Sequence, residues 1–448
     1  MAPPEDNSYG EMVFHSEQSE ESMEISKLYQ IFLQSAGVNT DTRTIGKNQL
    51  FVALKGENFD GNTFALQALE AGACAAVVND TIEANDPRLV KVPDTLEALK
   101  ALAAYHRQQL GIPVIGLTGT NGKTTTKELV STVLAAKYKV VSTVGNLNNE
   151  IGVPLSVLKI GQDAHLAVIE MGASHPEDLR PLLSVAQPTH GLITNVGKAH
   201  LEGFGSFEGV MHAKGLLYDY LKDHDGLAFA NADDDILQGM LWDRQMPCIP
   251  YGMYGVEVLP SNAQNPFLRM KLRDGRLVET HIVGAYNAYN ILAALKVGWF
   301  FQVPQEDAVK AIENYVPSNN RSQLVKTERN TLIVDAYNAN PSSMAVALDN
   351  LDRCEGKRIA LLGDMRELGA DSAAEHKKIV DRLCHSERSE ESILVGPEFT
   401  KAAQGTGIRV FEISPALAQW LMENPLSGYT VLIKGSRGIR MEKVIEKL

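Results

Sequence analysis

The segment from Val114 to Thr126 constrains the fold more than any other part of the 448-residue chain. It begins with the short apolar residues Val-Ile-Gly-Leu, which are typical of a buried parallel strand. A glycine-rich loop follows, and apolar residues then recur at helical spacing from Lys127 to Ala136. Strand, loop and helix in this order favour a loop that holds nucleotide phosphates over an ordinary glycine-rich turn.

The loop supplies each group that phosphate binding requires. Gly119 and Gly122 allow the backbone N–H groups to approach phosphate oxygens, and the following helix adds its positive N-terminal end. We expect Lys123 to reach the terminal phosphates of a nucleoside triphosphate and the Thr124 hydroxyl to bind Mg²⁺. Because Leu117 stands six residues before Lys123, the loop reads Gly-x2-Gly-Lys-Thr instead of the usual Gly-x4-Gly-Lys-Ser/Thr.

Composition excludes several classes of function. A formal net charge of -13 disfavours a general nucleic-acid binder, which needs a basic surface. No apolar run approaches the roughly 20 residues of a membrane span. The N-terminal residues are polar and acidic, so we expect no signal peptide and a cytoplasmic protein. The four cysteines are scattered without CxxC spacing, which argues against a zinc site and against disulfides.

Pattern and length together predict an α/β protein of three domains. The predicted parts are a flexible acidic N-terminal segment at 1–24, an αβ domain at 25–108, a central domain with a mostly parallel sheet at 109–316, and a second α/β domain at 317–448. An acidic octamer at His15 to Ser22 recurs at His385 to Ser392 with seven of eight positions matched, and we expect both copies to be exposed and mobile. No function is assigned to them.

Polar residues at the ends of predicted strands are candidate ligands in the central domain. Glu170 interrupts an apolar run where a strand ends, and a buried carboxylate there favours a cation partner. Thr194 and Asn195 end the next strand. His200 follows in a loop with three glycines, and its spacing alone does not separate a ligand from a structural histidine.

Other candidate residues have both a structural and a ligand-binding interpretation. The amides of Asn287 and Asn290, one helical turn apart, would read a base edge or cap a helix. For Thr42 and Arg43, residue chemistry alone favours a solvated loop over a pocket for a phosphorylated or sugar ligand. In the last domain three strands end in polar or glycine-rich segments, which predicts a ligand-facing rim. These segments are Asp335 to Pro341, Gly363 to Gly369 and Lys434 to Gly438.

Six motifs taken together resemble the Mur ligase family of bacterial cell-wall enzymes, and the resemblance covers nearly the whole chain. The motifs are Gly119-Thr-Asn-Gly-Lys-Thr-Thr-Thr126, Asn146-Leu-Asn-Asn-Glu-Ile-Gly-Val-Pro154, Glu170-Met-Gly172, Asn195-Val-Gly-Lys-Ala-His-Leu-Glu-Gly-Phe-Gly-Ser206, Asp335-Ala-Tyr-Asn-Ala-Asn-Pro-Ser-Ser343 and Gly363-Asp-Met-Arg-Glu-Leu-Gly369. The shortened phosphate loop is the form found in this family.

The resemblance implies an N-terminal UDP-substrate domain, a central P-loop ATPase and a Rossmann-like C-terminal domain. It implies an enzyme that phosphorylates the terminal carboxylate of UDP-N-acetylmuramoyl-tripeptide with ATP. The amine of D-alanyl-D-alanine then attacks the acyl phosphate to give the pentapeptide used in peptidoglycan synthesis. We expect both substrates to be small molecules and the enzyme to be a monomer that binds no nucleic acid or membrane.

The resemblance also implies roles for individual residues. Lys123, His200, Lys214 and Arg321 are expected to act in catalysis. The expected ATP contacts are Gly119, Thr120, Asn121, Gly122, Lys123, Thr124, Thr125, Asn287, Asn290, Arg321 and Asp335. Two Mg²⁺ sites are expected from Thr124, Glu170, His200 and Lys214, the last as a carbamate. The expected substrate contacts are Thr42, Arg43, Asn148, Asn149, Lys434, Ser436 and Arg437.

Other functions remain possible, and the sequence departs from the family pattern at two positions. The ligase that adds the third residue carries an Asp-Asn-Pro-Arg motif that does not occur here, and folylpolyglutamate synthase lacks the Asp335 to Pro341 combination. A nucleotide-binding switch without ligase activity is the alternative from another class. Tyr286 and Asn62 each replace a common histidine, so adenine and uridine contacts are expected to differ in detail. The sequence does not decide between lysine and diaminopimelate as third residue of the tripeptide.

Overall fold

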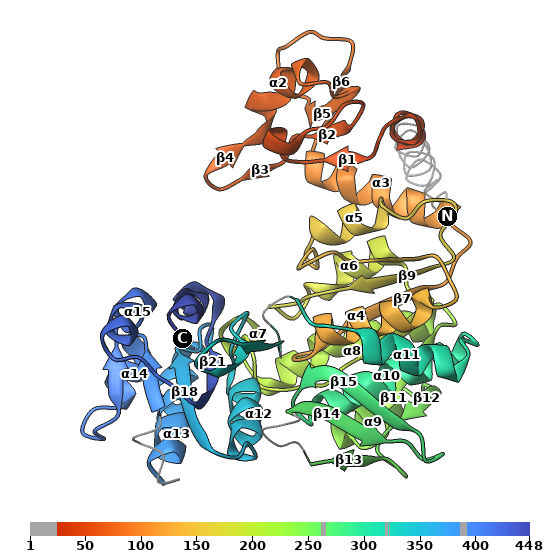
Figure 1. The fold of residues 1–448 in the computed structure, drawn as a ribbon. Helices are drawn as coiled ribbons and strands as arrows, with labels where there is room; N and C mark the ends of the chain where they lie inside the picture. The colour runs from red at the N-terminus through yellow and green to blue at the C-terminus, as the bar shows by residue number, and fades with distance from the viewer. Residues whose placement is uncertain (1–24, 261–265, 319–320, 322, 386–391) are drawn as a thin grey trace, which may run out of the picture. The chain divides into compact units, whose positions relative to one another are not determined.

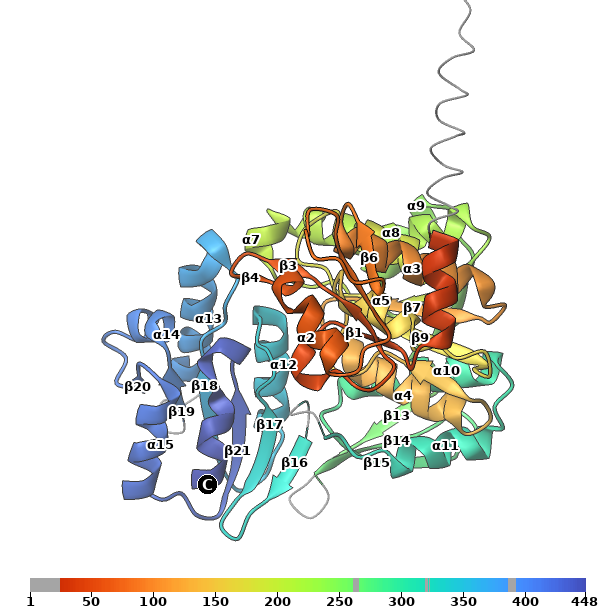
Figure 2. The same ribbon diagram turned by 90° about the horizontal axis from the view of Figure 1, so that it is seen from above.

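The computed structural model describes residues 25–260, 266–318, 321, 323–385 and 392–448. Figures 1 and 2 show the ribbon from two sides. The chain divides into two compact units. The first unit comprises Met1–Val114, Val141–Met171 and Arg180–Pro188, and the second comprises Ile115–Val140, Gly172–Leu179 and Thr189–Leu448. The acidic octamers lie outside the described residues, apart from His385 and Ser392. Within the described ranges, no helix has the length and apolar character needed to cross a bilayer.

The first unit contains a four-stranded parallel sheet in the order β1-β2-β5-β6. These strands are β1 (Val38–Asn39), β2 (Leu50–Val52), β5 (Ala75–Asn79) and β6 (Leu89–Val92). Strands β2 and β5 are buried apart from Asn79, because α2 (Ala65–Glu70) packs its alanine and leucine side chains onto the same core. The predicted strands near 50–54 and 75–78 and the helix near 64–71 are confirmed.

A short hairpin occupies the polar segment between β2 and α2. It consists of β3 (Lys55–Gly56) and β4 (Phe59–Asp60). Asn62 follows it and is buried, because its amide donates to Asp60 and Asn79 and its side-chain oxygen accepts the Asn79 N–H. Asn62 therefore fastens the hairpin to β5.

The remaining elements of the first unit follow the same alternation of helices and strands. They are α3 (Thr95–Gln109), most of β8 (Val140–Ser142), α5 (Gly152–Val157), β9 (Leu166–Glu170) and most of α6 (Leu179–Ala186). Helix α3 begins where the Asp94 carboxylate accepts the N–H groups of Leu96 and Glu97, as an N-cap does.

In the second unit four parallel strands run in the order β12-β11-β10-β7. They are β7 (Val114–Thr118), β10 (His190–Ile193), β11 (Leu227–Asn231) and β12 (Cys248–Tyr251). The connecting and covering helices are α4 (Lys123–Ala135), α7 (Leu201–Phe204), α8 (Phe207–Asp223), α9 (Asp235–Asp243), α10 (Asn287–Phe300) and α11 (Gln305–Asn314). Strand β7 is buried throughout, as its apolar sequence predicts.

A three-stranded antiparallel sheet follows β12 in the chain and was not predicted. It consists of β13 (Glu257–Leu259), β14 (Phe267–Lys271) and β15 (Leu277–Val283). In β15 buried and exposed residues alternate, which is the pattern of a strand with one covered face.

The C-terminal part of the second unit, drawn from teal to dark blue in Figure 1, contains a six-stranded sheet in the order β16-β17-β21-β18-β19-β20. Its strands are β16 (Gln323–Lys326), β17 (Thr331–Asp335), β18 (Lys357–Gly363), β19 (Ser392–Val395), β20 (Arg409–Phe411) and β21 (Tyr429–Lys434). Only β16 runs antiparallel to its neighbour among these described pairs.

Helices cover both faces of this C-terminal sheet. Apolar residues of α12 (Pro341–Asp352), α13 (Ser372–His385) and α14 (Pro397–Ala402) join one core cluster. Residues of α15 (Ser414–Glu423) and of the C-terminal turns join the other. The order β17-β21-β18 places the carboxyl ends of three neighbouring strands side by side, so the predicted rim is one continuous edge.

Candidate active site

The phosphate loop connects β7 to α4 and requires its two glycines. Gly119 has φ +143°, and a Cβ there would lie 2.0 Å from Thr194 Oγ1. Gly122 has φ +78° and is the residue before α4 begins. The Lys123 ammonium donates to the carbonyls of Gly119 and Thr120 over 2.7 and 3.1 Å. The cation therefore lies against the loop whose predicted ligand is a phosphate chain.

The end of β10 fixes the shape of this loop. Asn195 accepts the Asn121 N–H with its side-chain oxygen, and it donates its amide to the Asn121 carbonyl, both over 3.0 Å. Thr194 Oγ1 donates to the same carbonyl over 2.6 Å, and the Thr120 N–H donates to the Asn195 carbonyl. Thr194 and Asn195, which the sequence places at this strand end, thus hold the backbone of the phosphate loop at Asn121.

Asn287 and Asn290 lie at the start of α10 and are both buried. Asn290 accepts from Thr126 Oγ1 over 3.0 Å and donates to Asn287, whose own amide donates to the Val283 carbonyl. These bonds favour the structural interpretation of the two side chains, which tie α10 to the first turn of α4. Their contact with ATP stays a prediction.

Lys214 lies on α8 with 2% of its surface exposed. Its ammonium donates to the Ala173 carbonyl over 3.3 Å and lies 5.2 Å from the centre of the Phe204 ring. Burial, aided by repulsion from Lys123 and opposed by Asp178, lowers the pKa of Lys214 well below 10.5. A buried lysine with a lowered pKa is the form of amine that reacts with CO₂ to give a carbamate.

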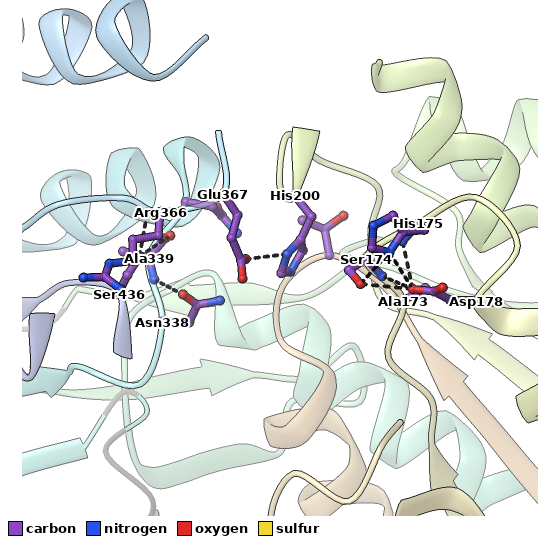
Figure 3. A network of polar contacts seen from close by, with 12 residues as sticks. Ala173, Ser174, His175, Asp178, His200, Asn338, Ala339, Arg366, Glu367 and Ser436 are labelled. Carbon is purple, nitrogen blue, oxygen red and sulfur yellow. Dashed lines mark hydrogen bonds and ion pairs between the residues drawn. The ribbon is translucent and has the colours of Figure 1, made fainter. Parts of the chain in front are cut away.

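The loop that carries Ala173 is closed by Asp178 (Figure 3). The carboxylate of Asp178 accepts the N–H groups of Ser174 and His175, each over 2.8 Å. Burial acts to raise the pKa of Asp178, but these backbone donors outweigh it, so the pKa lies below its ordinary value. The closed loop holds the Ala173 carbonyl in place for Lys214.

His200 is the residue before α7 and has a left-handed backbone with φ +51°. Its Nδ1 lies 2.6 Å from the Glu367 carboxylate, which comes from the loop after β18 (Figure 3). This hydrogen bond is the main reason that the pKa of Glu367 is lowered, with burial opposing it. Glu367 was not among the predicted site residues.

At the C-terminal edge, predicted ATP and peptide contacts meet. Lys434 Nζ lies 2.5 Å from Asp335 Oδ2 and donates to the Asn338 carbonyl, and only 1% of its side chain is exposed. Ser436 Oγ donates to the Ala339 carbonyl and accepts the Arg366 N–H (Figure 3). These contacts join the three polar segments of the rim. Lys434 and Asp335 therefore neutralise each other, and both remain candidate ligand contacts.

Two arginines of this edge share one aromatic ring. The guanidinium of Arg321 lies 3.8 Å from the centre of the Tyr337 ring, and that of Arg437 lies 5.5 Å from it. Stacked guanidinium groups keep their N–H edges available for carboxylates and phosphates. Tyr337 therefore brings together two arginines for which the family resemblance implies different substrates.

Asn340 joins this edge to the phosphate loop. Its amide donates to the Asn121 side-chain oxygen over 2.8 Å. Asn340 also caps α12, because its side chain accepts the Ser343 N–H while Ser343 Oγ accepts the Asn340 N–H. The nucleotide-binding loop and the C-terminal rim thus share one polar network.

The remaining candidates belong to the first unit. Glu170 is buried at the end of β9, where it accepts the Asn148 amide over 2.9 Å. Asn149 accepts the N–H of Gly152 at the start of α5. Thr42 and Arg43 lie in a 3-10 turn, and the Arg43 side chain is 87% exposed in an ion pair with Asp41. An exposed pair of this kind leaves the arginine accessible to a ligand.

In the described part of the chain, no three His, Cys, Asp or Glu side chains form a group that could hold a metal ion. The predicted donors are a threonine hydroxyl, a buried carboxylate and an imidazole. Mg²⁺ in nucleotide sites takes one or two protein ligands and completes its shell with water and phosphate oxygens. The Thr124 hydroxyl and the Glu170 carboxylate are each an oxygen ligand of the kind that Mg²⁺ takes.

Comparison with known proteins identifies the family. Three family models match in succession: "Mur ligase family, catalytic domain" at residues 34–107, "Mur ligase middle domain" at 117–298 and "Mur ligase, glutamate ligase domain" at 320–437. The UDP-N-acetylmuramoyl-tripeptide--D-alanyl-D-alanine ligase of Bacillus subtilis is 35% identical over 438 residues, which cover 92% of this chain and 93% of the relative. The chain belongs to the Mur ligase family.

Further relatives agree with this assignment. The Escherichia coli ligase of the same name is 34% identical over 430 residues, covering 92% of this chain and 93% of its own. The crystal structure of MurF from Acinetobacter baumannii superposes with a TM-score of 0.82 at 29% identity, covering 94% of this chain and 98% of that one. MurF from Thermotoga maritima in complex with ADP superposes with a TM-score of 0.80 at 27% identity, covering 93% and 97%.

These findings confirm the predicted family, the three-domain α/β fold and the ligase class. The exact domain boundaries and the roles of individual site residues stay predictions. Glu367, Asn340 and Tyr337 were not among the predicted site residues, although each lies inside a Mur ligase motif of the sequence.

Proposed function

We propose that this Mur ligase is an ATP-dependent enzyme that joins D-alanyl-D-alanine to UDP-N-acetylmuramoyl-tripeptide. The observation that carries the proposal is the 35% identity, over 92% of the chain, to a Bacillus subtilis ligase of that name. The shared network of the phosphate loop and the C-terminal rim supports it, because ATP and an amine substrate must act on one carboxylate.

The chemistry follows from the low reactivity of a carboxylate toward amines. A carboxylate oxygen of the tripeptide attacks the γ-phosphorus of ATP, and ADP leaves. The amine of D-alanyl-D-alanine then attacks the acyl carbon, and phosphate leaves as the amide forms and the amine loses a proton. Lys123 binds the transferred phosphate, and Arg321 neutralises charge that develops on it.

Magnesium supplies charge neutralisation when bound, and Thr124 and Glu170 are the side chains that would hold one ion. A second cation would be held by His200 and in part by the carbamate of Lys214. The buried amine of Lys214, close enough to Lys123 for repulsion to lower its pKa, supports this modification because the carbamate is an anion.

Product formation separates the ligase from a plain nucleotide switch. ADP and phosphate should form at a substantial rate only when the UDP-muramoyl-tripeptide and D-alanyl-D-alanine are both present. Equal release with either substrate omitted would replace the ligase with an ATPase. Tripeptides ending in lysine or diaminopimelate, tested with a panel of amino acceptors and product masses, would identify both substrates. We expect the active enzyme to be a monomer.

A further inference from the structure

The side chain of His200 is held by a residue of the C-terminal sheet. Its Nδ1 lies 2.6 Å from Glu367 Oε2 (Figure 3). A carboxylate only accepts hydrogen bonds, so this contact is stabilising when Nδ1 carries the proton. In the neutral ring the lone pair then lies on Nε2, which is the arrangement of a histidine that binds a cation through Nε2.

The loop that carries Glu367 is fixed on both sides of this residue. The Met365 N–H donates to His376 Nε2 over 3.0 Å, and the Arg366 N–H donates to Ser436 Oγ over 2.9 Å. Met365 and Leu368 are both buried in the core of the C-terminal sheet. The backbone next to Glu367 therefore has little freedom to move.

The first residue of the same loop is also anchored. The Asp364 carboxylate accepts the N–H groups of Glu398 and Phe399 at the start of α14, over 2.9 and 2.8 Å. Its carbonyl accepts the Ser436 N–H over 3.1 Å. These bonds hold the loop against both α14 and the segment after β21.

Glu367 itself has a left-handed backbone with φ +64°. Non-glycine residues rarely adopt this strained conformation, and it persists where the surroundings enforce it. The loop accepts this conformation at the residue that points to His200. The carboxylate is thus directed by the backbone and not by a flexible side chain alone.

The short helix α7 is held from two sides, which fixes His200 as well. A Cβ on Gly203 would lie 2.2 Å from the Ser174 carbonyl oxygen, and a Cβ on Gly369 would lie 3.1 Å from Glu202 Cβ. A side chain at position 203 would overlap with the Ser174 carbonyl, and one at position 369 would be crowded by Glu202. The histidine and the glutamate are therefore presented to each other by packed backbone.

We infer that Glu367 is a positioning residue, whose carboxylate holds His200 in the tautomer that offers Nε2 to a divalent cation. This inference rests on the proposed function, since the cation belongs to that site. Removing a carboxylate that orients a histidine ligand weakens metal affinity by about 10- to 100-fold in proteins. The C-terminal sheet would thereby help to set the affinity of a cation bound at the central domain.

Binding of Mn²⁺ in the presence of ADP, measured by electron paramagnetic resonance, tests the inference. We expect Glu367→Ala to weaken Mn²⁺ binding by about 10-fold. Glu367→Gln keeps the size of the side chain but loses its charge, and it should fall between the alanine variant and the unsubstituted protein. Glu412→Gln, at an exposed carboxylate directly after β20, is the matched control and should change nothing.

A double substitution shows whether Glu367 acts through His200. In a His200→Ala background, Glu367→Ala should cause no further loss of Mn²⁺ affinity, because the group it positions is gone. An additive loss would make Glu367 a ligand in its own right and would overturn the inference. Spectra of ¹⁵N-histidine-labelled protein should show His200 protonated at Nδ1, and at Nε2 after Glu367→Ala.

Different results would contradict the positioning role of Glu367 and the proposed ligase activity. If ligation proceeds with Mg²⁺ while Glu367→Ala leaves both the Mn²⁺ affinity and the His200 tautomer unchanged, only the positioning role is wrong. If the unsubstituted protein neither binds Mn²⁺ with ADP nor forms the amide, the proposed function fails and the positioning role fails with it.

Discussion

The Asn340 amide donates to the side-chain oxygen of Asn121 over 2.8 Å, and this bond joins the phosphate loop to the first turn of α12. Asn121 lies between the two glycines of the loop, and Asn340 caps the helix that follows β17. A nucleotide that moves Asn121 would therefore also act on Asn340 and on the rim that carries Asp335 and Arg437.

Asn340→Ser separates the capping role from this bond. Serine caps helices about as well as asparagine, so the free energy of unfolding should change by less than about 0.5 kcal/mol. Serine has no amide to reach Asn121, so we expect kcat to fall while the thermal midpoint is kept. Asn340→Ala should lose both activity and about 1 kcal/mol of stability. Full activity in Asn340→Ser would show that the bond has no part in catalysis.

Gly119→Ala should destroy the phosphate loop. The new Cβ would lie 2.0 Å from Thr194 Oγ1, and φ is +143°, so steric overlap adds to backbone strain. We expect no ATP binding by calorimetry and a clear loss of thermal stability. Gly275→Ala is the control, because φ is +86° there but nothing lies within 4 Å of the added Cβ. Equal effects of the two substitutions would contradict the role of the contact with Thr194.

Lys214→Ala should abolish ligase activity, and short carboxylic acids should restore part of it. The substitution opens a space beside the Ala173 carbonyl where a small carboxylate can take the place of the carbamate. The rate should rise with added acetate or formate in the variant but not in the unsubstituted enzyme. Unimpaired activity in Lys214→Ala would remove this lysine from the metal site.

The lowered pKa of Lys214 also makes a prediction about stability. Below pH 10.5 this lysine is protonated in the unfolded chain, whereas burial disfavours its charged form in the folded chain. The free energy of unfolding therefore rises with pH between the lowered pKa of the folded state and pH 10.5. In CO₂-free buffer, Lys214→Met should therefore raise the thermal midpoint at neutral pH. The advantage should shrink toward pH 10.5. A difference independent of pH would mean that burial does not oppose the charge.

The sequence predicted the parts of the site that depend on local spacing. The phosphate loop follows from Gly119, Gly122 and Lys123, and the rim follows because parallel strands end at one edge of a sheet. The pairing of His200 with Glu367 could not be predicted, since it depends on how two distant loops pack. The β13 to β15 sheet had a readable signal, because apolar and polar residues alternate along Leu277–Val283.

Oxygen transfer between the substrates tests the central claim most directly. The tripeptide, labelled with ¹⁸O in both oxygens of its terminal carboxylate, is incubated with ATP, Mg²⁺ and D-alanyl-D-alanine, and the released phosphate is analysed by mass. Because a carboxylate oxygen attacks the γ-phosphorus, the account predicts one ¹⁸O in each phosphate and one in the new amide carbonyl. Unlabelled phosphate alongside amide product would contradict an acyl-phosphate route.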